Sequence, residues 1–458
     1  MIKKIFCLLS ITILIFSCTY KVDNTLKGKT VIRFWHPFSM TSALGKTLQA
    51  MIDEFNKQHP QWFIKPEGMG SYSVLKQKLL AAIIAENQPE MALAYQSWIT
   101  KFYAGKKILV IEDYVNKGEL EEIKKDLFEV FIKNCTIDGK IVSMPFNKSM
   151  PVLYYNKDMF ERFNIKKLPE SWDEFIEICK KLTIDTNNDG KIDIYGTITR
   201  INLTDFLNFI MQNDGGILSE DGKEILFNKP EAVEALKFFF SWKYIHNIAN
   251  FYTSGDPYQY QNDFSSGKCA MIIGSCVSRY FMKYSLTFRL GTAPIFGNKK
   301  KAVNVYGTDI IIFNKANEEQ RKAAWEFIKY FISPENTAKW SVKTAYMPVR
   351  KSALNNLILK QEFEKDPELK TTILQLDYGF LEPAFESWLL GRNYLSEEIN
   401  NAFIDKEIEK KYNEYLKILK KGDEEEIKKE REEMEKVLEN RIKIYLDKAA
   451  KKTSHWIF

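Results

Sequence analysis

Short apolar segments alternate with stretches of helical periodicity near the start of this chain, and this alternation constrains the fold more than any other feature. Residues 31–35, 62–66 and 91–94 have the length and apolar character of short strands. Between them, apolar residues recur at the spacing of one helix face, which predicts helices through residues 44–55 and 75–83. Strands joined by helices form a largely parallel sheet with helices on its faces, so the sequence predicts an α/β fold.

Three loops that follow the predicted strands carry polar or aromatic residues. These loops comprise residues 35–36, 70–72 and 96–98. Ligands of parallel sheets bind beyond the C-terminal ends of the strands. We therefore expect the three loops to face one shared site.

The rest of the chain is predicted to add further helices. They span residues 172–182, with Ser171 as the N-cap, and residues 230–244 and 321–332. Residues 404–449 are rich in Lys and Glu with spaced apolar residues, which is typical of one or two surface helices with charge pairs four residues apart. We interpret this segment as a solvated helical face, and a helix that binds a partner is the alternative.

The N-terminus has the features of an export signal. Lys3 and Lys4 precede an apolar run at residues 5–16, which ends at Ser17 and Cys18. The run is too short to span a bilayer comfortably as a helix. Its arrangement resembles a bacterial lipoprotein signal.

This resemblance implies a lipid-anchored protein of the bacterial cell envelope, on the periplasmic or extracellular side of a membrane. Residues 1–17 would be removed as a signal peptide, Cys18 would be lipidated, and residues 18–28 would tether the folded body to the membrane. An uncleaved anchor helix and a plain secretory signal are the alternatives.

Composition excludes several classes of protein. Apart from the N-terminal run, no stretch of the sequence is apolar enough to meet a membrane, which excludes a multi-span membrane protein. The net charge is +6 over 458 residues, without a basic block, which argues against a nucleic-acid partner. Four cysteines beyond Cys18 lack CxxC spacing, so we expect small buried thiols rather than a disulfide framework.

Five sequence segments occur in the order that characterises one family of proteins. They are IRFWH at residues 32–36, PFN at 145–147, PVLYYNK at 151–157, FSSGKCAM at 264–271, and residues 327–349, which end in TAYMPV. With these segments the chain resembles the family 1 extracellular solute-binding proteins of bacterial ABC importers, and within that family the glycerol-3-phosphate-binding type. The resemblance covers nearly the whole chain after the export signal.

The resemblance implies a two-lobed, periplasmic-binding-protein type II fold, in which a hinge joins the lobes and the ligand binds in a cleft between them. Ligand-stabilised closure would produce the form that the permease subunits of the importer recognise. The implied N-terminal lobe comprises residues 29–147 plus 308–344. The C-terminal lobe, with its C-terminal helices, comprises residues 148–307 plus 345–458. We expect a monomer that requires no cofactor.

The resemblance also implies a set of ligand-binding residues. Five positions match the family's contacts with glycerol 3-phosphate: Tyr72, Ser149, Ser275, Gly307 and Tyr346. These residues come from segments far apart in the sequence, so the fold has to bring them together.

Two further positions depart from the family pattern. Gln96 stands where the family has a glutamate, and the family's late contact arginine has no clear counterpart, since Arg392 is only nearby. Arginine binds phosphate through two parallel hydrogen bonds, so its loss disfavours a phosphorylated ligand. A neutral sugar, oligosaccharide or polyol fits at least as well. The aromatic candidates to pack against its C–H groups are Trp35, Trp98, Trp242, Tyr258, Tyr260 and Trp388.

One loop has the ligand spacing of a calcium site. Its oxygen donors would be the side chains of Asp185, Asn187, Asp189 and Asp193 and the carbonyl of Lys191. The twelfth position of the motif is Gly196, so the usual bidentate glutamate is absent. The predicted calcium would be structural and remote from the ligand, and an Asx-rich surface turn without an ion is the alternative.

The sequence thus favours a non-catalytic binding protein that captures a sugar, oligosaccharide or glycerol-3-phosphate-like solute and delivers it to an ABC importer. A secreted glycosidase with paired carboxylates is one alternative, and a surface lipoprotein used in sensing or adhesion is the other. The sequence contains no HExxH, GxSxG or Walker motif, which would have indicated an enzyme.

Overall fold

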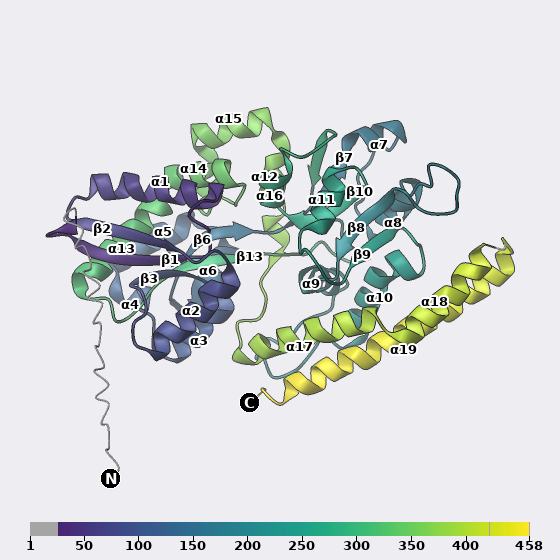
Figure 1. Ribbon diagram of the computed structural model, residues 1–458. Helices are drawn as coiled ribbons and strands as arrows, with labels where there is room; N and C mark the ends of the chain where they lie inside the picture. Colours follow the sequence, from purple (N-terminus) through teal and green to yellow (C-terminus); the bar gives the residue numbers. More distant parts are fainter. Residues whose placement is uncertain (1–25, 421, 458) are drawn as a thin grey trace, which may run out of the picture.

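The computed structural model describes residues 26–420 and 422–457, and its strands form two separate five-stranded sheets. Figure 1 shows the N-terminal sheet, in purple and blue, beside a second sheet in teal, with helices packed around each. The α/β prediction is therefore confirmed. The predicted signal peptide at residues 1–17 and the lipidation site Cys18 lie outside the described residues, as does most of the predicted tether.

The first sheet has the strand order β2-β1-β3-β13-β6. β1 (Thr30–His36), β2 (Trp62–Gly68) and β3 (Met91–Tyr95) occupy the three predicted strand positions, and β1 is parallel to both of its neighbours. β13 (Tyr306–Ile312) lies between β3 and β6 (Met144–Ser149) and is antiparallel to both. The sheet is mixed rather than largely parallel, because β13 enters from the second half of the molecule and runs in the opposite direction.

Helices α1 (Ala43–Gln58) and α2 (Tyr72–Ile84) connect the first three strands, as their apolar spacing predicted. Each begins at a serine whose side chain accepts a hydrogen bond from a backbone amide of the first turn, Ser42 for α1 and Ser71 for α2. The apolar face of α1 is buried through Leu48, Met51, Ile52 and Phe55.

The second sheet has the order β11-β7-β10-β8-β9. Its strands are β7 (Pro151–Asn156), β8 (Tyr195–Arg200), β9 (Ala249–Tyr252), β10 (Cys269–Ser275) and β11 (Leu290–Ala293). β8 is parallel to β9 and β10, whereas β7 is antiparallel to β10 and β11. Short two-stranded ladders complete the strands: β4 (Thr136–Ile137) with β5 (Lys140–Ile141), and β12 (Val303–Asn304) with β14 (Gly379–Phe380).

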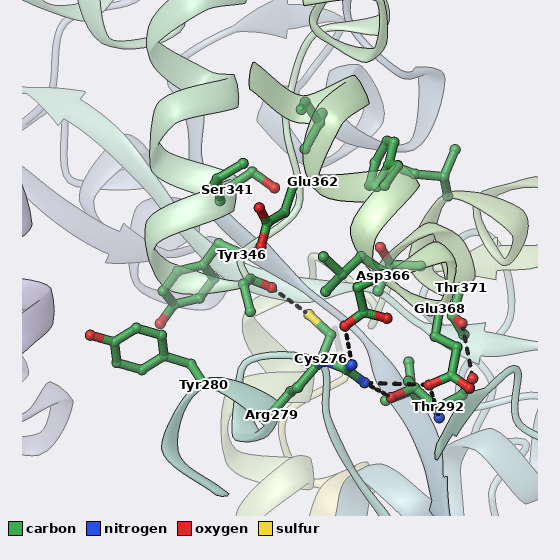
Figure 2. A pocket seen from close by; sticks show the side chains of 18 of the residues that line it. Cys276, Arg279, Tyr280, Thr292, Ser341, Tyr346, Glu362, Asp366, Glu368 and Thr371 are labelled. Atoms are coloured by element: carbon green, nitrogen blue, oxygen red, sulfur yellow. Dashed lines mark hydrogen bonds and ion pairs between the residues drawn. The ribbon is translucent and has the colours of Figure 1, made fainter. Parts of the chain in front are cut away.

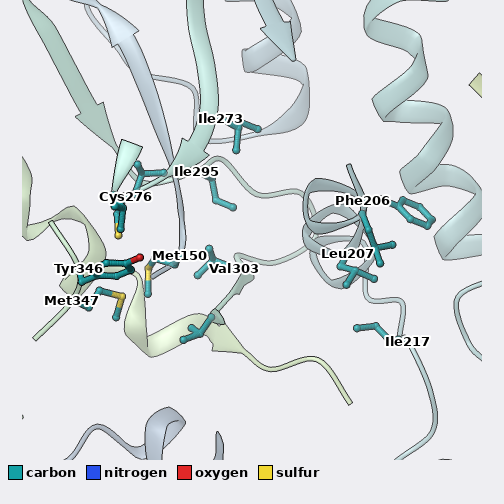
Figure 3. Packing of buried hydrophobic residues seen from close by; sticks show 14 of the residues in the cluster. Met150, Phe206, Leu207, Ile217, Ile273, Cys276, Ile295, Val303, Tyr346 and Met347 are labelled. Carbon is teal, nitrogen blue, oxygen red and sulfur yellow. The ribbon is translucent and has the colours of Figure 1, made fainter. Parts of the chain in front are cut away.

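The chain passes from the first sheet to the second at Met150, the residue between β6 and β7, and it returns between β12 and β13. A third connection runs beside them, where the Met347 amide donates to the Lys148 carbonyl at 2.9 Å. Figure 3 shows Met150, Tyr346, Met347 and Val303 gathered in this region. These crossings connect the two halves at one narrow zone, and the exact lobe boundaries proposed from the sequence stay a prediction.

Further helices cover the two sheets. The predicted helices at 172–182, 230–244 and 321–332 correspond to α8, α10 and α13, and Ser171 caps α8 as expected. The covering helices are α3 (Gln96–Ala104), α4 (Ile111–Tyr114), α5 (Lys117–Asp126), α6 (Glu129–Cys135), α7 (Lys157–Arg162), α8 (Trp172–Lys181), α9 (Leu203–Gln212), α10 (Pro230–Tyr244), α11 (Gln259–Ser265), α12 (Ser278–Met282), α13 (Glu318–Phe331), α14 (Pro334–Thr344), α15 (Leu357–Lys365) and α16 (Thr371–Leu374).

The C-terminal part forms three helices, α17 (Glu386–Phe403), α18 (Lys406–Leu419) and α19 (Glu424–Ser454). α19 packs against α17, α18 and α10, and the far ends of α18 and α19 extend together away from the body (Figure 1). The predicted helices are confirmed, and their spaced apolar residues pack against neighbouring helices. One stripe of α19 is buried and comprises Met434, Leu438, Ile442 and Leu446.

Two predictions from composition can be compared with the structure. Cys135, Cys179, Cys269 and Cys276 are free and buried, as expected for small apolar side chains. Among residues 26–420 and 422–457, no helix has the length and apolar character needed to cross a membrane.

Candidate functional site

A cavity of about 710 Å³ lies between the two halves of the molecule and is lined by residues from both. Tyr95, Gln96 and Trp98 come from the end of β3 and the start of α3, in the first half. Arg200 and Asp205 come from the end of β8 and the start of α9, in the second half. A cavity with two such walls is typical of small-molecule sites between domains. We call it the cleft.

Aromatic side chains form a large part of the cleft wall. The structure places the predicted Trp98 there, edge-on to Tyr95 with ring centroids 5.3 Å apart. Ring faces can pack against the C–H groups of a sugar or polyol, while the polar edges bind its hydroxyls. The aromatic residues of the wall are Tyr95, Trp98, Tyr258, Tyr260, Tyr306 and Trp388. Trp98, Tyr258, Tyr260 and Trp388 were candidates from the sequence, whereas Tyr95 and Tyr306 were not. The candidate Trp242 is buried on α10 and does not line the cleft.

Trp35 does not line the cleft. Its indole Nε1 donates a 2.7 Å hydrogen bond to Glu67 Oε2 on the neighbouring strand β2. The next residue, His36, is fully buried, and burial lowers the pKa of its imidazole to about 4. The first of the three predicted loops therefore does not contribute to this cavity, whereas the third, at residues 96–98, contributes all of its residues.

Two predicted residues meet at the bottom of the cleft, where the chain crosses between the sheets. Ser149 Oγ and Ser275 Oγ lie 2.6 Å apart, and Ser275 lines the cavity while Ser149 is buried beneath it. Gly307 also lines the cavity and has a φ of +132°. A Cβ atom at Gly307 would lie 2.1 Å from the carbonyl oxygen of Asn147, so only glycine allows β13 to approach β6 this closely.

Tyr72 and Tyr346 lie together behind the cleft surface. Their hydroxyl oxygens are 3.5 Å apart, and Asn147 Nδ2 donates to Tyr72 Oη at 2.9 Å. Tyr346 is buried and stacks on Trp340, with ring centroids 6.0 Å apart and an interplanar angle of 7°. Burial raises the pKa of both phenols, so both remain neutral hydrogen-bonding groups. In this structure they support the cleft without lining it.

The structure changes the interpretation of the missing arginine. Arg392, on α17, lines the cleft, and its Nε donates to Glu382 Oε2 at 2.8 Å. Arg200 and Lys76 also line the cavity. Helix α17 folds back across the cleft and contacts α3, which brings Arg392 into the site although its position in the sequence did not indicate this. The cleft therefore contains three cationic side chains.

A second, smaller hollow of about 120 Å³ lies beside α12 and α15 and is lined in part by Tyr346. Figure 2 shows its one bonded cation, Arg279, joined to Asp366 and Thr292, with Glu368 beside them. Arg279 is fully engaged within the protein, and Cys276 Sγ donates to the Ala345 carbonyl at 3.3 Å. The hollow is much smaller than the cleft, and its arginine is already paired with Asp366, so the larger cleft is the better candidate site.

The predicted calcium loop is an exposed turn held by its own backbone. Asp185 Oδ2 accepts from the Gly190 amide at 2.8 Å, and Asn187 Oδ1 accepts from the Asp189 amide at 2.9 Å. Among the residues that the structure describes, no group of three or more His, Cys, Asp or Glu side chains is arranged to hold a metal. These bonds suit an Asx-rich turn as well as an ion site, so calcium binding here stays a prediction.

That prediction is tested by thermal unfolding in the presence of calcium. A bound ion raises the Tm by mass action, so millimolar calcium should shift the wild-type transition upward. Asp189→Ala should abolish the shift, and magnesium, which demands a tighter octahedral geometry, should give none in either protein. A wild-type Tm that is insensitive to calcium would show that the loop is only a turn.

The pKa of one carboxyl group in the cleft, that of Asp205, is strongly raised. Asp205, in the first turn of α9, is buried, and burial raises its pKa to about 7 against a hydrogen bond from Asn202 Nδ2 at 2.7 Å. The unfolded chain releases this proton near pH 4, whereas the folded protein retains it until about pH 7. The stability that Asp205 contributes is therefore present below pH 4 and is lost as the pH rises towards 7.

We expect Asp205→Asn to remove this pH dependence, because the amide is neutral throughout. At pH 8 the variant should exceed the wild type in free energy of unfolding by roughly 2–4 kcal/mol, and at pH 4 the difference should be small. Urea unfolding at several pH values measures both quantities. The exposed Asp256→Asn is the matched control and should change neither; equal effects of the two variants would contradict the burial argument.

Comparisons with known proteins agree with this geometry. Two curated relatives are the sn-glycerol-3-phosphate-binding periplasmic proteins UgpB of Shigella dysenteriae, 27% identical over 366 residues, and of Escherichia coli K12, 27% identical over 364 residues. In both cases the match spans 76% of this chain and 80% of the relative.

Solved structures show the same fold. UgpB from Mycobacterium tuberculosis, in complex with glycerophosphocholine, has a TM-score of 0.72 at 20% identity, covering 92% of this chain and 99% of the other. The substrate-binding protein Lmo0181 from Listeria monocytogenes, in complex with cycloalternan, has a TM-score of 0.73 at 19% identity, covering 94% and 99%. The two-lobed architecture with an interlobe cleft is therefore confirmed.

The sequence pattern that defines one family matches most of the chain. The model of bacterial extracellular solute-binding proteins covers residues 50–371, which include both sheets except for β1. Solute binding is thus the role that fold and family have in common, and the chain belongs to the family of bacterial extracellular solute-binding proteins.

Proposed function

We propose that this protein binds a small solute of the carbohydrate or glycerol-phosphate class in its interlobe cleft and delivers it to an ABC importer. The observation that carries the proposal is the cleft itself, which combines aromatic faces with hydrogen-bonding and cationic side chains from both halves. The names of the relatives support the same class, since UgpB proteins bind sn-glycerol 3-phosphate and Lmo0181 was solved with cycloalternan.

Within that class we propose an anionic solute, such as a glycerol phosphate ester, in place of the neutral sugar that the sequence favoured. Arg200, Arg392 and Lys76 outnumber the carboxyl groups Glu382 and Asp205. Asp205 is partly protonated near neutral pH because burial raises its pKa to about 7. Only the Nε of Arg392 is bonded within the described residues, so its Nη groups can form the paired hydrogen bonds that a phosphate accepts.

We propose that the protein is not an enzyme. Its two cleft carboxyl groups are both bonded to neighbours: Asp205 accepts from Asn202, and Glu382 accepts from Trp388 Nε1 at 2.9 Å as well as from Arg392. A pair of carboxyl groups that hydrolysed a glycoside would have one free to attack or to activate water. Binding and release of the solute, with closure of the lobes around it, explains the two bonded carboxyl groups without any catalytic step.

The choice of solute is tested by thermal-shift screening, followed by calorimetric titration, with glycerol 3-phosphate, glycerophosphocholine and maltose. We expect glycerol 3-phosphate or glycerophosphocholine to stabilise the protein more than maltose does. Arg392→Gln should weaken binding of the phosphate ester about tenfold or more, because it removes hydrogen bonds to a charged group.

The control for that variant is Arg162→Gln, which removes one positive charge from the exposed helix α7, away from the cleft, and should leave the affinity within twofold of the wild type. A larger increase in Tm with maltose than with either phosphate ester would refute the proposed anionic solute and would favour a neutral sugar. Binding of none of the three would direct the search to other solutes of the class.

We also propose that Cys18 is the lipidated first residue of the mature protein, as the charged start and short apolar run of the export signal indicate. Membrane-fraction protein from a bacterial host should carry the mass of acyl chains on an N-terminal peptide beginning at Cys18. Cys18→Ala should release the protein from the membrane. An intact residue 1 on the membrane-bound protein would show an uncleaved anchor instead.

A further inference from the structure

A chain of hydrogen bonds runs from the cleft surface to a buried ion pair. Gln96 and Asn134 both line the cleft, and Asn134 Nδ2 donates to Gln96 Oε1 at 2.7 Å. Behind them, Lys148 Nζ donates to Asn134 Oδ1 and lies 2.6 Å from Asp309 Oδ1. Lys148 and Asp309 have no exposed side-chain surface. Every partner in this series of bonds is a protein group.

The direction of every bond in this chain follows from the ammonium group. Lysine carries only donors, so the atom of Asn134 that faces Lys148 must be its oxygen. The Asn134 amide nitrogen then faces Gln96 and can only donate, which requires the Gln96 oxygen to accept. The N–H groups of Gln96 therefore face the cleft, and no group among the described residues accepts a hydrogen bond from them.

These bond directions hold for a charged Lys148, whose counter-ion Asp309 is in direct contact with it. Burial raises the pKa of Asp309, but its neighbours are donors that favour the carboxylate: Lys148, and the Cys135 thiol with its Sγ 3.4 Å from Asp309 Oδ1. Burial also raises the pKa of Cys135, so the thiol keeps its proton and donates. The counter-ion of Lys148 is in direct contact through Asp309 Oδ1, which favours the charged pair, whereas Asp309 Oδ2 has no hydrogen-bond partner among the described residues.

We propose that the buried Lys148 ammonium fixes the side-chain amide of Gln96 with its nitrogen toward the cleft, so that residue 96 is a hydrogen-bond donor to the solute. Gln96 is then the residue that selects a solute with an acceptor atom at this point of the wall, such as a phosphoryl, carboxylate or ether oxygen. A glutamate at the same place would present an acceptor and would select a hydroxyl donor. Asn134 is a positioning residue, since it acts through Gln96.

The consequence for the solute rests on the proposed function, but the orientation of the amide does not. It is measured without any ligand, from the exchange of the Gln96 side-chain amide protons with water by NMR of the whole protein labelled with ¹⁵N at glutamine. The resonances of Gln96 are those that disappear in Gln96→Glu. Failure of this experiment would leave solute binding intact, and failure of the ligand screen would leave this experiment unaffected.

In the wild type we expect the Gln96 amide protons to exchange within about tenfold of those of the exposed Gln361, because no hydrogen bond to the protein protects them. Asn134→Asp replaces the amide that donates to Gln96 with a carboxylate that can only accept. The Gln96 amide should then turn and donate to it, and exchange should slow by about tenfold or more.

Asn393→Asp is the matched control, because it adds the same charge to another part of the cleft wall; it should change Gln96 exchange by less than twofold. Protected amide protons on Gln96 in the wild type would overturn the proposal, whether or not Asn134→Asp folds. So would a folded Asn134→Asp variant whose Gln96 protons exchange as in the wild type.

Discussion

The two halves of this molecule are joined where β6 and β13 lie side by side, and the buried ion pair between Lys148 and Asp309 links these two strands. β6 continues directly into the second sheet through Met150, and β13 begins where the chain returns from it. Neither charge reaches solvent, so each needs the other to avoid a large cost of burial. The position of both halves relative to the cleft therefore depends on this contact and on Gly307, which lets the two strands approach.

The same zone supplies the bottom of the cleft. Ser149 and Ser275 meet there from different sheets, and the hydroxyl groups of Tyr72 and Tyr346 lie behind it. Rigid support at the crossing and a ligand site beside it suit a protein that closes around a solute, because small rotations at the crossing move the outer walls most. Cationic and aromatic residues that would recognise the solute sit on those outer walls, on α2, α3 and α17 and at the end of β8.

Much of the fold could be predicted because it is encoded locally. The apolar spacing of α1 and α2, the serine caps of α1, α2 and α8, and the strands on either side of them depend on residues close together in the chain. The mixed direction of the first sheet could not be predicted this way, since β13 pairs with β3 across more than two hundred intervening residues. The buried stripe of α19 follows the local spacing of its apolar residues, but which helices it packs against depends on the tertiary structure.

The sequence by itself determined the α/β class, the family pattern and the residue types available at Gln96, Ser275 and Gly307. Only the tertiary structure decided that Trp35 pairs with Glu67 away from the cleft, that Tyr72 and Tyr346 stand behind its surface, and that Arg392 faces into it. It also decided which way the Gln96 amide points, through a lysine that is distant in sequence. The physical reason is that a side chain's role depends on its partners. Packing between distant segments determines those partners, and a local sequence pattern does not encode that packing.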